Sequence, residues 1–270
     1  MSQETLCAVT NILRESFAEY REKAAQYLGS HALGDFRKCP ALYKKKMLGL
    51  MLDEDRPAYV FGRAAHTLVL EGVEQFRKEY ARGGPVNTRT GKPYGPTSQA
   101  FLDWASAQGK PALTKEQVEL CQDLYNSVHA HSQAAELLSE GIAEGVVRAE
   151  YAGIQCQIRM DWFNPFEGIV DFKTCDDLTY FEADARRYGY LHQLAFYRAV
   201  LKQKLNTTAP VHLIAVEKKE PYRCGVWRIE PAALDVAQRE NEATIARLLE
   251  CTANDTWPTG YEEPRTFNSF

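Results

Sequence analysis

Asp171 and Lys173 lie two residues apart in an apolar run, 168–174, which predicts a β-strand. Residues two apart on a strand point to the same face, so a carboxylate and an ammonium group would share one pocket. Asp161 comes ten residues before Asp171, and the asparagine, proline and glycine within 164–168 predict a turn between them. Two acids and one lysine would therefore meet at one end of a hairpin.

This trio suits metal-assisted chemistry on a phosphate. A small, hard cation such as Mg²⁺ takes oxygen ligands and is usually held by one or two carboxylates together with substrate phosphate, which matches Asp161 and Asp171. Lys173 would orient an attacking water or help to deprotonate it, and would offset negative charge that develops on the phosphate. The alternative is a surface ion pair on an edge strand, because a three-residue D-x-K pattern often occurs by chance.

Two predicted helices add further polar residues. Residues 181–203 show an amphipathic pattern that places Gln193 and Tyr197, four apart, on one face. Residues 59–70 predict a second helix, with His66 among apolar and small residues. Taken alone, such a histidine is more often a core residue than a ligand.

The ordered set of motifs resembles the PD-(D/E)xK nuclease superfamily. The resemblance points to the branch that contains RecB-type nuclease domains, lambda exonuclease and the C-terminal nuclease domain of RecE (exonuclease VIII), and it covers about residues 27–229. The matching residues, in order, are Ser30, Leu33, Phe36, Cys39, Pro40 and Tyr43; Gly62 and His66; Arg159 and Asp161; Asp171, Lys173 and Thr174; and Gln193 and Tyr197. Met160 stands where the motif that names the superfamily has proline.

The resemblance implies a role for each residue of the metal site. His66, Asp161 and Asp171, with the backbone carbonyl of Phe172, would hold Mg²⁺, for which Mn²⁺ would substitute. Lys173 would activate water. These assignments come from the family pattern and not from the spacing of the residues.

The resemblance also implies that Gln193 and Tyr197 line the site near DNA, and that a glutamate on an earlier strand completes it. Glu144 and Glu150 both fall in a predicted strand, 142–151, and lie an even number of positions apart. Alternation places both on the same face and does not choose between them. The spacing to the first aspartate favours Glu144.

The predicted elements agree with the α/β core that such nucleases share, a central mixed β-sheet flanked by helices, here with a helical N-terminal elaboration. Strands are predicted at 142–151, 154–163, 168–174, 211–217 and 224–229, and helices at 1–28, 30–39, 59–70, 98–107, 115–140, 181–203 and 231–250. Residues 82–97, with four glycines and three prolines, predict a loop.

We expect a single domain, made of an N-terminal helix (1–28), a nuclease core (29–230), and a C-terminal helix with an aromatic tail (231–270) that docks on the body or on another subunit. The sequence has no run of about 20 apolar residues and no positively charged leader, which predicts a cytoplasmic protein. Seven cysteines without a C-x-x-C pair argue against a zinc knuckle and a disulfide framework, and the absence of H-E-x-x-H argues against a zinc hydrolase.

The net charge of −4 is unusual for a protein that contacts DNA, because phosphate contacts require lysine and arginine. Net charge averages over the surface, however, and basic residues do cluster. The candidate DNA-binding residues are Arg159, Arg186, Arg187, Lys44, Lys45, Lys46, Arg89 and Lys92. The alternative for these groups is a solvated basic face or an ordinary surface connection.

The resemblance implies a Mg²⁺-dependent 5′-to-3′ exonuclease that degrades one strand of double-stranded DNA from its end. The resulting 3′ single-stranded overhang would serve recombination by strand annealing, in a phage or prophage setting and with an annealing protein as partner. A homo-oligomeric ring, trimer or tetramer, would enclose the duplex. Two alternatives stay open: an endonuclease or single-strand-specific DNase on the same scaffold, and a non-catalytic DNA-binding subunit, against which the intact Asp161, Asp171 and Lys173 argue.

Overall fold

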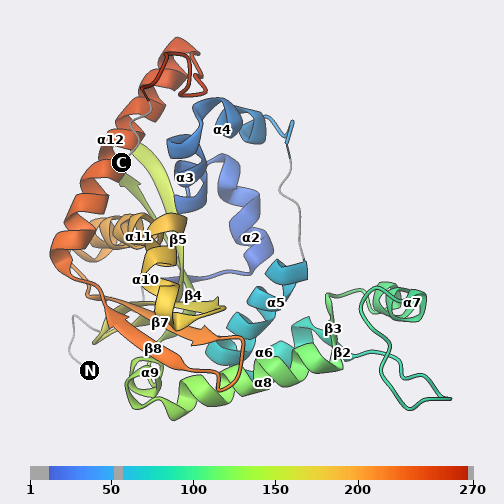
Figure 1. The fold of residues 1–270 in the computed structure, drawn as a ribbon. Coiled ribbons are helices and arrows are strands. Elements are labelled where there is room, and N and C mark those ends of the chain that lie inside the picture. The colour runs from blue at the N-terminus through green and yellow to red at the C-terminus, as the bar shows by residue number, and fades with distance from the viewer. Residues whose placement is uncertain (1–11, 52–56, 267–270) are drawn as a thin grey trace.

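The computed structural model describes residues 12–51 and 57–266. Its main sheet has six strands in the order β1-β4-β5-β6-β7-β8 (Figure 1), and of its strand pairs β6 and β7 run parallel while the others are antiparallel. The strands are β1 (Leu13–Arg14), β4 (Ile142–Tyr151), β5 (Ile154–Asn164), β6 (Gly168–Cys175), β7 (Val211–Glu217) and β8 (Cys224–Arg228). The predicted mixed α/β sheet is confirmed. Its five predicted strands end within one residue of the predicted bounds, and β1, which lies within the predicted helix 1–28, is an additional strand.

Helices surround this sheet, and a small parallel pair of strands, β2 (Ala81–Gly83) and β3 (Ala112–Thr114), lies apart from it. The helices are α2 (Phe17–Glu22), α3 (Ser30–Lys38), α4 (Pro40–Met47), α5 (Pro57–His66), α6 (Gly72–Glu79), α7 (Gln99–Ala107), α8 (Lys115–Ala130), α9 (Ser132–Leu137), α10 (Phe181–Tyr188), α11 (Tyr190–Leu205) and α12 (Pro231–Asn254). Short helical turns are η1 (Lys23–Ala25), η3 (Leu178–Tyr180) and a π-helical turn, η2 (Thr67–Glu71), which continues α5. In the described ranges, no helix combines the length and the apolar character that crossing a membrane requires.

The sheet is covered on both faces. Helices α3, α11 and α12 share one buried cluster with residues of β5 and β6, whereas α5, α8 and α9 share a second cluster with the alternate residues of β6 and β7. Ile169 belongs to the first cluster, and Val170 and Phe172 belong to the second. β6 is therefore a strand buried on both sides, which explains why it reads as a continuous apolar run.

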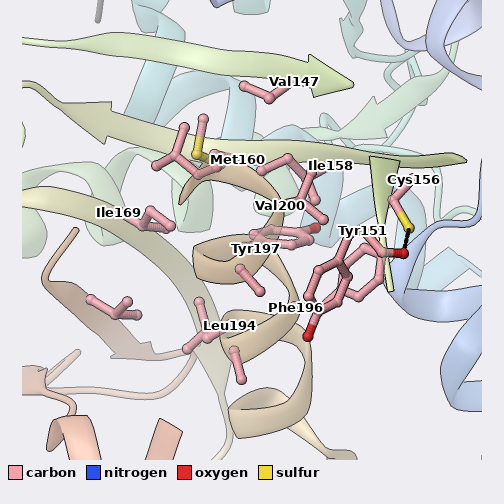
Figure 2. Close-up of a cluster of buried hydrophobic side chains, with 14 of the residues drawn as sticks. Val147, Tyr151, Cys156, Ile158, Met160, Ile169, Leu194, Phe196, Tyr197 and Val200 are labelled. Carbon is pink, nitrogen blue, oxygen red and sulfur yellow. Dashed lines mark hydrogen bonds between the residues drawn. The ribbon is translucent and has the colours of Figure 1, made fainter. Parts of the chain in front are cut away.

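Figure 2 shows how α11 is held against the sheet. Leu194, Phe196 and Val200 are fully buried beside Ile158 and Met160 of β5. Burying an aliphatic or aromatic side chain contributes about 1.5–3 kcal/mol relative to exposure, so this contact fixes the position of α11. The residues at the N-terminal end of α11 are therefore also held in a fixed position.

The structure corrects three predicted helices. Residues 181–203 are divided into α10 and α11 at Gly189, which adopts a left-handed φ of 75°, and residues 115–140 are divided into α8 and α9 at His131. The described part of 1–28 is not one helix, because Ser16 and Glu19 form a capping box that starts α2 after the short strand β1. Residues 1–11 lie outside the described part of the chain.

The start of the C-terminal tail packs on α4, the first of the two predicted alternatives, whereas Tyr261 farther along is 73 % exposed. The ring of Trp257 stacks on Tyr43 with centroids 6.1 Å apart, and Lys44 Nζ lies 4.6 Å from its centroid. The Ala41 N–H donates to the carbonyl of Pro258 at 3.1 Å. The aromatic residues Phe267 and Phe270 lie outside the described residues.

Residues 84–111 form an arm that carries α7 and projects away from the body in Figure 1. The arm includes most of the predicted loop 82–97. Its two ends are joined by the β2–β3 pair, in which Ala81 lies beside Ala112 and Gly83 beside Thr114. The arm thus leaves and rejoins the body at one place.

The turn between β5 and β6 is the one predicted, and it depends on two residues. The Asn164 side chain accepts hydrogen bonds from the backbone N–H groups of Phe166 (2.8 Å) and Glu167 (3.0 Å), which is an Asx turn. Gly168 follows with φ +84°, and the Ile169 N–H donates to the Pro210 carbonyl at 3.0 Å. This geometry sets the register of β6 against β7.

We predict that Gly168→Ala destabilises the protein by about 3 kcal/mol or more, from backbone strain and overpacking together. A Cβ at this position would lie 2.2 Å from the Pro210 oxygen, in addition to the positive φ. Gly91→Ala is the control, because Gly91 has a φ of +69° but nothing within 4 Å of the added Cβ. Urea unfolding checks this, and equal losses in the two variants would contradict it.

Candidate metal centre

The site forms where β5 and β6 separate. These strands pair at Asn164–Gly168, Phe163–Ile169 and Trp162–Val170. Asp161 and Asp171 are the next residues beyond the Trp162–Val170 pair, on β5 and β6 respectively. The divergence of the strands makes room for side-chain groups between their ends.

Asp161 Oδ2 is the centre of this arrangement. It accepts a hydrogen bond from the Phe172 N–H at 2.9 Å, lies 3.5 Å from His66 Nδ1, and lies 4.0 Å from Lys173 Nζ. The His66 ring also contacts the Phe172 ring, with centroids 5.0 Å apart. Helix α5 and strands β5 and β6 therefore meet at one carboxylate.

Glu144 is the glutamate that joins this group. One potential ligand atom from each of His66, Glu144 and Asp161 lies within 4.8 Å of the others. Glu144 adopts a φ of +53°, and the β4–β5 pairing skips from Ala143–Trp162 to Gly145–Met160 at this point. A left-handed backbone is strained for a residue other than glycine, and such strain is common at functional sites.

The positive φ also distinguishes Glu144 from Glu150. Alternation along a regular strand assumes extended backbone throughout, and Glu144 departs from it. Glu150 is exposed, farther along β4, and pairs with Gln155 at the opposite end of the β4–β5 hairpin. Alternation did not choose between the two glutamates and spacing favoured Glu144; the structure places Glu144 with His66 and Asp161.

Burial and nearby charges shift the protonation of these groups. Burial, with the Lys173 charge, lowers the pKa of His66 to about 4, so its imidazole is neutral at pH 7 and able to ligate a metal. Burial and the Asp161 carboxylate raise the pKa of Glu144 to about 8. The Arg159 guanidinium, with Nη1 3.0 Å from Glu144 Oε2, opposes that rise but does not outweigh it.

Asp171 and Lys173 form a buried ion pair beside the three-residue group. Lys173 Nζ lies 2.5 Å from Asp171 Oδ2, and Asp171 is fully buried. Burial raises the pKa of Asp171 to about 6 although the Lys173 charge opposes the rise. Burial alone would lower the pKa of Lys173, but the Asp171 and Asp161 carboxylates raise it, so the lysine is protonated.

The donor set fits a divalent cation. His66, Glu144 and Asp161 offer one imidazole nitrogen and carboxylate oxygens, a set that suits Mg²⁺ or Mn²⁺. Asp171 Oδ1 is buried and has no hydrogen-bond partner among the described residues. A buried carboxylate oxygen without a partner is costly, and a cation would satisfy it. The carbonyl of Phe172 as a ligand stays a prediction.

Gln193 and Tyr197 lie together on α11. Gln193 Nε2 donates to Tyr197 Oη at 3.1 Å. Tyr197 is 5 % exposed and packs in the core cluster shown in Figure 2, and burial raises its pKa well above the usual value. The Asp161 and Asp171 carboxylates contribute to that rise, so Tyr197 lies near the site on its core side.

Arg159 lies in the site, where it pairs with Glu144 and its guanidinium carbon is 5.2 Å from the Phe17 ring centroid. The other predicted DNA-binding arginines and lysines are spread over the surface. Arg186 and Arg187 are exposed on α10, the helix that follows β6. Arg89 and Lys92 are exposed on the projecting arm.

The basic group on α4 is partly neutralised by residues distant in sequence. Lys44 Nζ lies 3.4 Å from Asp255 Oδ1, and Lys46 Nζ lies 2.8 Å from Asp35 Oδ2. Lys45 is exposed. Contacts of this segment with DNA stay a prediction, and the structure gives Lys44 and Lys46 other partners.

Two residues near the site were missed by the sequence analysis. Lys173 Nζ lies 5.1 Å from the Tyr190 ring centroid, within the range of a cation–π contact. Burial lowers the pKa of His31, and the charges of Lys173 and Asp171 also act on it, so His31 faces the same group. Tyr190 follows Gly189 and His31 follows Ser30, and neither residue belongs to a motif whose spacing would have predicted its place near the site.

A mixed sheet with acids and a lysine at diverging strand ends defines a PD-(D/E)xK-like α/β domain. The chain matches the family described as "PDDEXK-like domain of unknown function (DUF3799)" over residues 30–267, and it belongs to that family. No curated protein matches it.

Among solved structures, the chain is similar to a crystal structure described as a "Putative exonuclease" from Eubacterium rectale. The TM-score is 0.70, the sequence identity is 16 %, and the match covers 95 % of this chain and 97 % of that chain. A likeness at this identity shows the fold alone.

We predict that the metal-free protein loses stability as the pH rises from about 4.5 to about 8, because the folded-state pKa of Glu144 is raised from 4.5 to about 8. The neutral carboxyl group of Glu144 stabilises the folded protein fully at a pH below the unfolded-state pKa. This stabilisation is lost as the pH rises through the folded-state pKa. Glu144→Gln should remove this loss, on the order of 2 kcal/mol between pH 5 and pH 8.

The measurement is urea unfolding in EDTA across that pH range. Asp171 also loses its proton as the pH rises, and this lowers the stability of the wild type and of Glu144→Gln alike. The difference in stability between the two proteins therefore reports Glu144. Glu150→Gln, an exposed carboxyl on the same strand, is the control and should follow the wild type. Parallel curves for wild type and Glu144→Gln would contradict the prediction.

Proposed function

We propose that this protein is a metal-dependent nuclease that hydrolyses DNA phosphodiesters. One observation carries the proposal: His66, Glu144 and Asp161 gather beside the buried Asp171–Lys173 pair at the point where β5 and β6 separate. Carboxylates next to a fixed ammonium group can neutralise and orient a phosphate at a cation. Membership of the PDDEXK-like family supports the same reaction.

His66, Glu144 and Asp161 would hold the cation, Mg²⁺ or Mn²⁺, and Asp171 would offer its free oxygen to the same ion. With the cation bound, the site gains positive charge that polarises a phosphate oxygen and stabilises the leaving 3′ oxygen. Lys173 is protonated, so it acts by donating hydrogen bonds to the attacking water and to the phosphate. Tyr190 and Asp171 hold its ammonium group in place.

We further propose that the substrate is a double-stranded DNA end and that digestion runs 5′ to 3′, leaving a 3′ overhang for strand annealing. The resemblance to lambda exonuclease and the RecE nuclease domain supports this polarity. The same resemblance supports a ring of three or four subunits and a single-strand annealing partner. The catalytic residues themselves do not encode polarity.

We predict that Asp171→Asn and Lys173→Ala each reduce Mg²⁺-dependent hydrolysis of end-labelled linear duplex by at least about 100-fold, because each removes charge that acts on the transition state. Lys202→Ala, at an exposed lysine of α11, should keep wild-type activity. Full activity in either site variant would overturn the proposal. Folding of each variant is checked by its thermal midpoint.

The alternatives are separated by substrate shape. A 5′-to-3′ exonuclease should degrade linear duplex and spare covalently closed circles, and a 5′ block should stop it while a 3′ block does not. Cleavage of circles would indicate an endonuclease. A non-catalytic subunit would bind DNA without releasing nucleotides at any Mg²⁺ concentration.

A further inference from the structure

The segment 12–28 lies before the region that matches the family, which begins at residue 30, yet it packs directly against the site. Strand β1 pairs with β4 beside Glu144, with Arg14 opposite Gly145 and Leu13 opposite Val146. Ile12 is buried against Gly145, where an added Cβ would lie 2.7 Å from its side chain. The start of the segment is therefore fixed to the strand that carries the site glutamate.

A partly buried ion pair fixes the segment a second time. Arg148 of β4 donates two hydrogen bonds to Glu15, both at 2.7 Å, and Lys23 adds a third at 2.8 Å. The hydrogen bond from Arg148 lowers the pKa of Glu15 to about 2. A bidentate pair of this kind specifies geometry as well as charge, so α2 begins in a defined place.

Phe17 is the first residue of α2, and it is 45 % exposed. The guanidinium carbon of Arg159 lies 5.2 Å from its ring centroid, and Arg159 Nη1 lies 3.0 Å from Glu144 Oε2. One arginine side chain thus separates an exposed aromatic ring from the candidate metal ligands. Phe17 and Glu144 are therefore neighbours of the same guanidinium group.

The charges around Phe17 favour a polyanion. Arg21 lies with its guanidinium carbon 5.7 Å from the ring centroid, and both Arg14 and Arg21 are exposed. Glu19 is turned back to Ser16 as part of the capping box. Glu22 is five residues after Phe17, which places it on another side of the helix.

We propose that Phe17 stacks on a nucleobase of the DNA strand whose phosphate lies at His66, Glu144 and Asp161, and that the strand is unpaired at this nucleotide. The inference rests on the proposed function. Aromatic rings flanked by arginines bind single-stranded nucleic acid by stacking, without sequence preference. The competing explanation is that Phe17 only shields the Arg159–Glu144 pair from water.

The test measures binding of a fluorescein-labelled oligothymidylate by fluorescence anisotropy, with Ca²⁺ in place of Mg²⁺. Phe17→Ala should weaken binding about tenfold, the scale of one stacked base, and Phe17→Trp should restore it. Phe166→Ala, at an exposed aromatic residue in the β5–β6 turn, is the matched control and should bind like wild type.

Abasic sites placed one at a time along the oligonucleotide identify the partner base. At the stacked position, an abasic site should weaken binding to wild type about tenfold and leave binding to Phe17→Ala unchanged. A shielding role predicts instead that Phe17→Ala weakens binding equally with and without each base, and this result would overturn the proposal. Thermal midpoints show whether the variants are folded.

The two proposals fail in different ways. If Phe17 shows the abasic-site dependence but Mg²⁺ releases no nucleotides, the stacking site stands and the nuclease proposal fails. If hydrolysis proceeds but Phe17→Ala binds every oligonucleotide as tightly as wild type, the nuclease proposal stands and the stacking site fails.

Discussion

A charged pair inside the core is the constraint on which the site depends. β6 lies between β5 and β7 with helices on both of its faces, so Asp171 has no access to water. Its carboxylate is tolerated because Lys173 supplies an opposite charge at 2.5 Å. Removing one partner of a buried pair leaves an uncompensated charge that costs about 3–5 kcal/mol. The charge of the site is thus part of the interior of the protein.

The two buried clusters hold that charge in a defined geometry. The cluster under α5 fixes His66 through Phe172, and the cluster under α11 fixes Tyr197 and the helix that carries Tyr190. Within the candidate site, Glu144 has a left-handed backbone conformation, and its carboxyl group lies near His66 and Asp161. Rigid support on both faces with local strain at one ligand is typical of a preorganised site.

The sequence predicted the sheet well because apolar runs of strand length leave few other choices. It also predicted the turn that brings Asp161 and Asp171 together, which the structure shows to be an Asx turn. The spacing favoured Glu144 over Glu150, but alternation along β4 did not separate them, since the positive φ at Glu144 is a tertiary effect. The ion pairs of Lys44 and Lys46 join residues distant in sequence or on neighbouring helices, so a count of basic residues overstated the free charge of α4. Phe17 gave no signal because its contact with Arg159 joins residues far apart along the chain.

The arm that carries α7 is an excursion whose two ends are pinned side by side by β2 and β3. Lengthening a surface loop costs little free energy once its ends are fixed, and here the two ends pack against α8. Evolution can therefore extend, trim or replace this excursion without disturbing the core. Variation in its length among homologues would be a record of adaptation to different surroundings, separate from the chemistry at the strand ends.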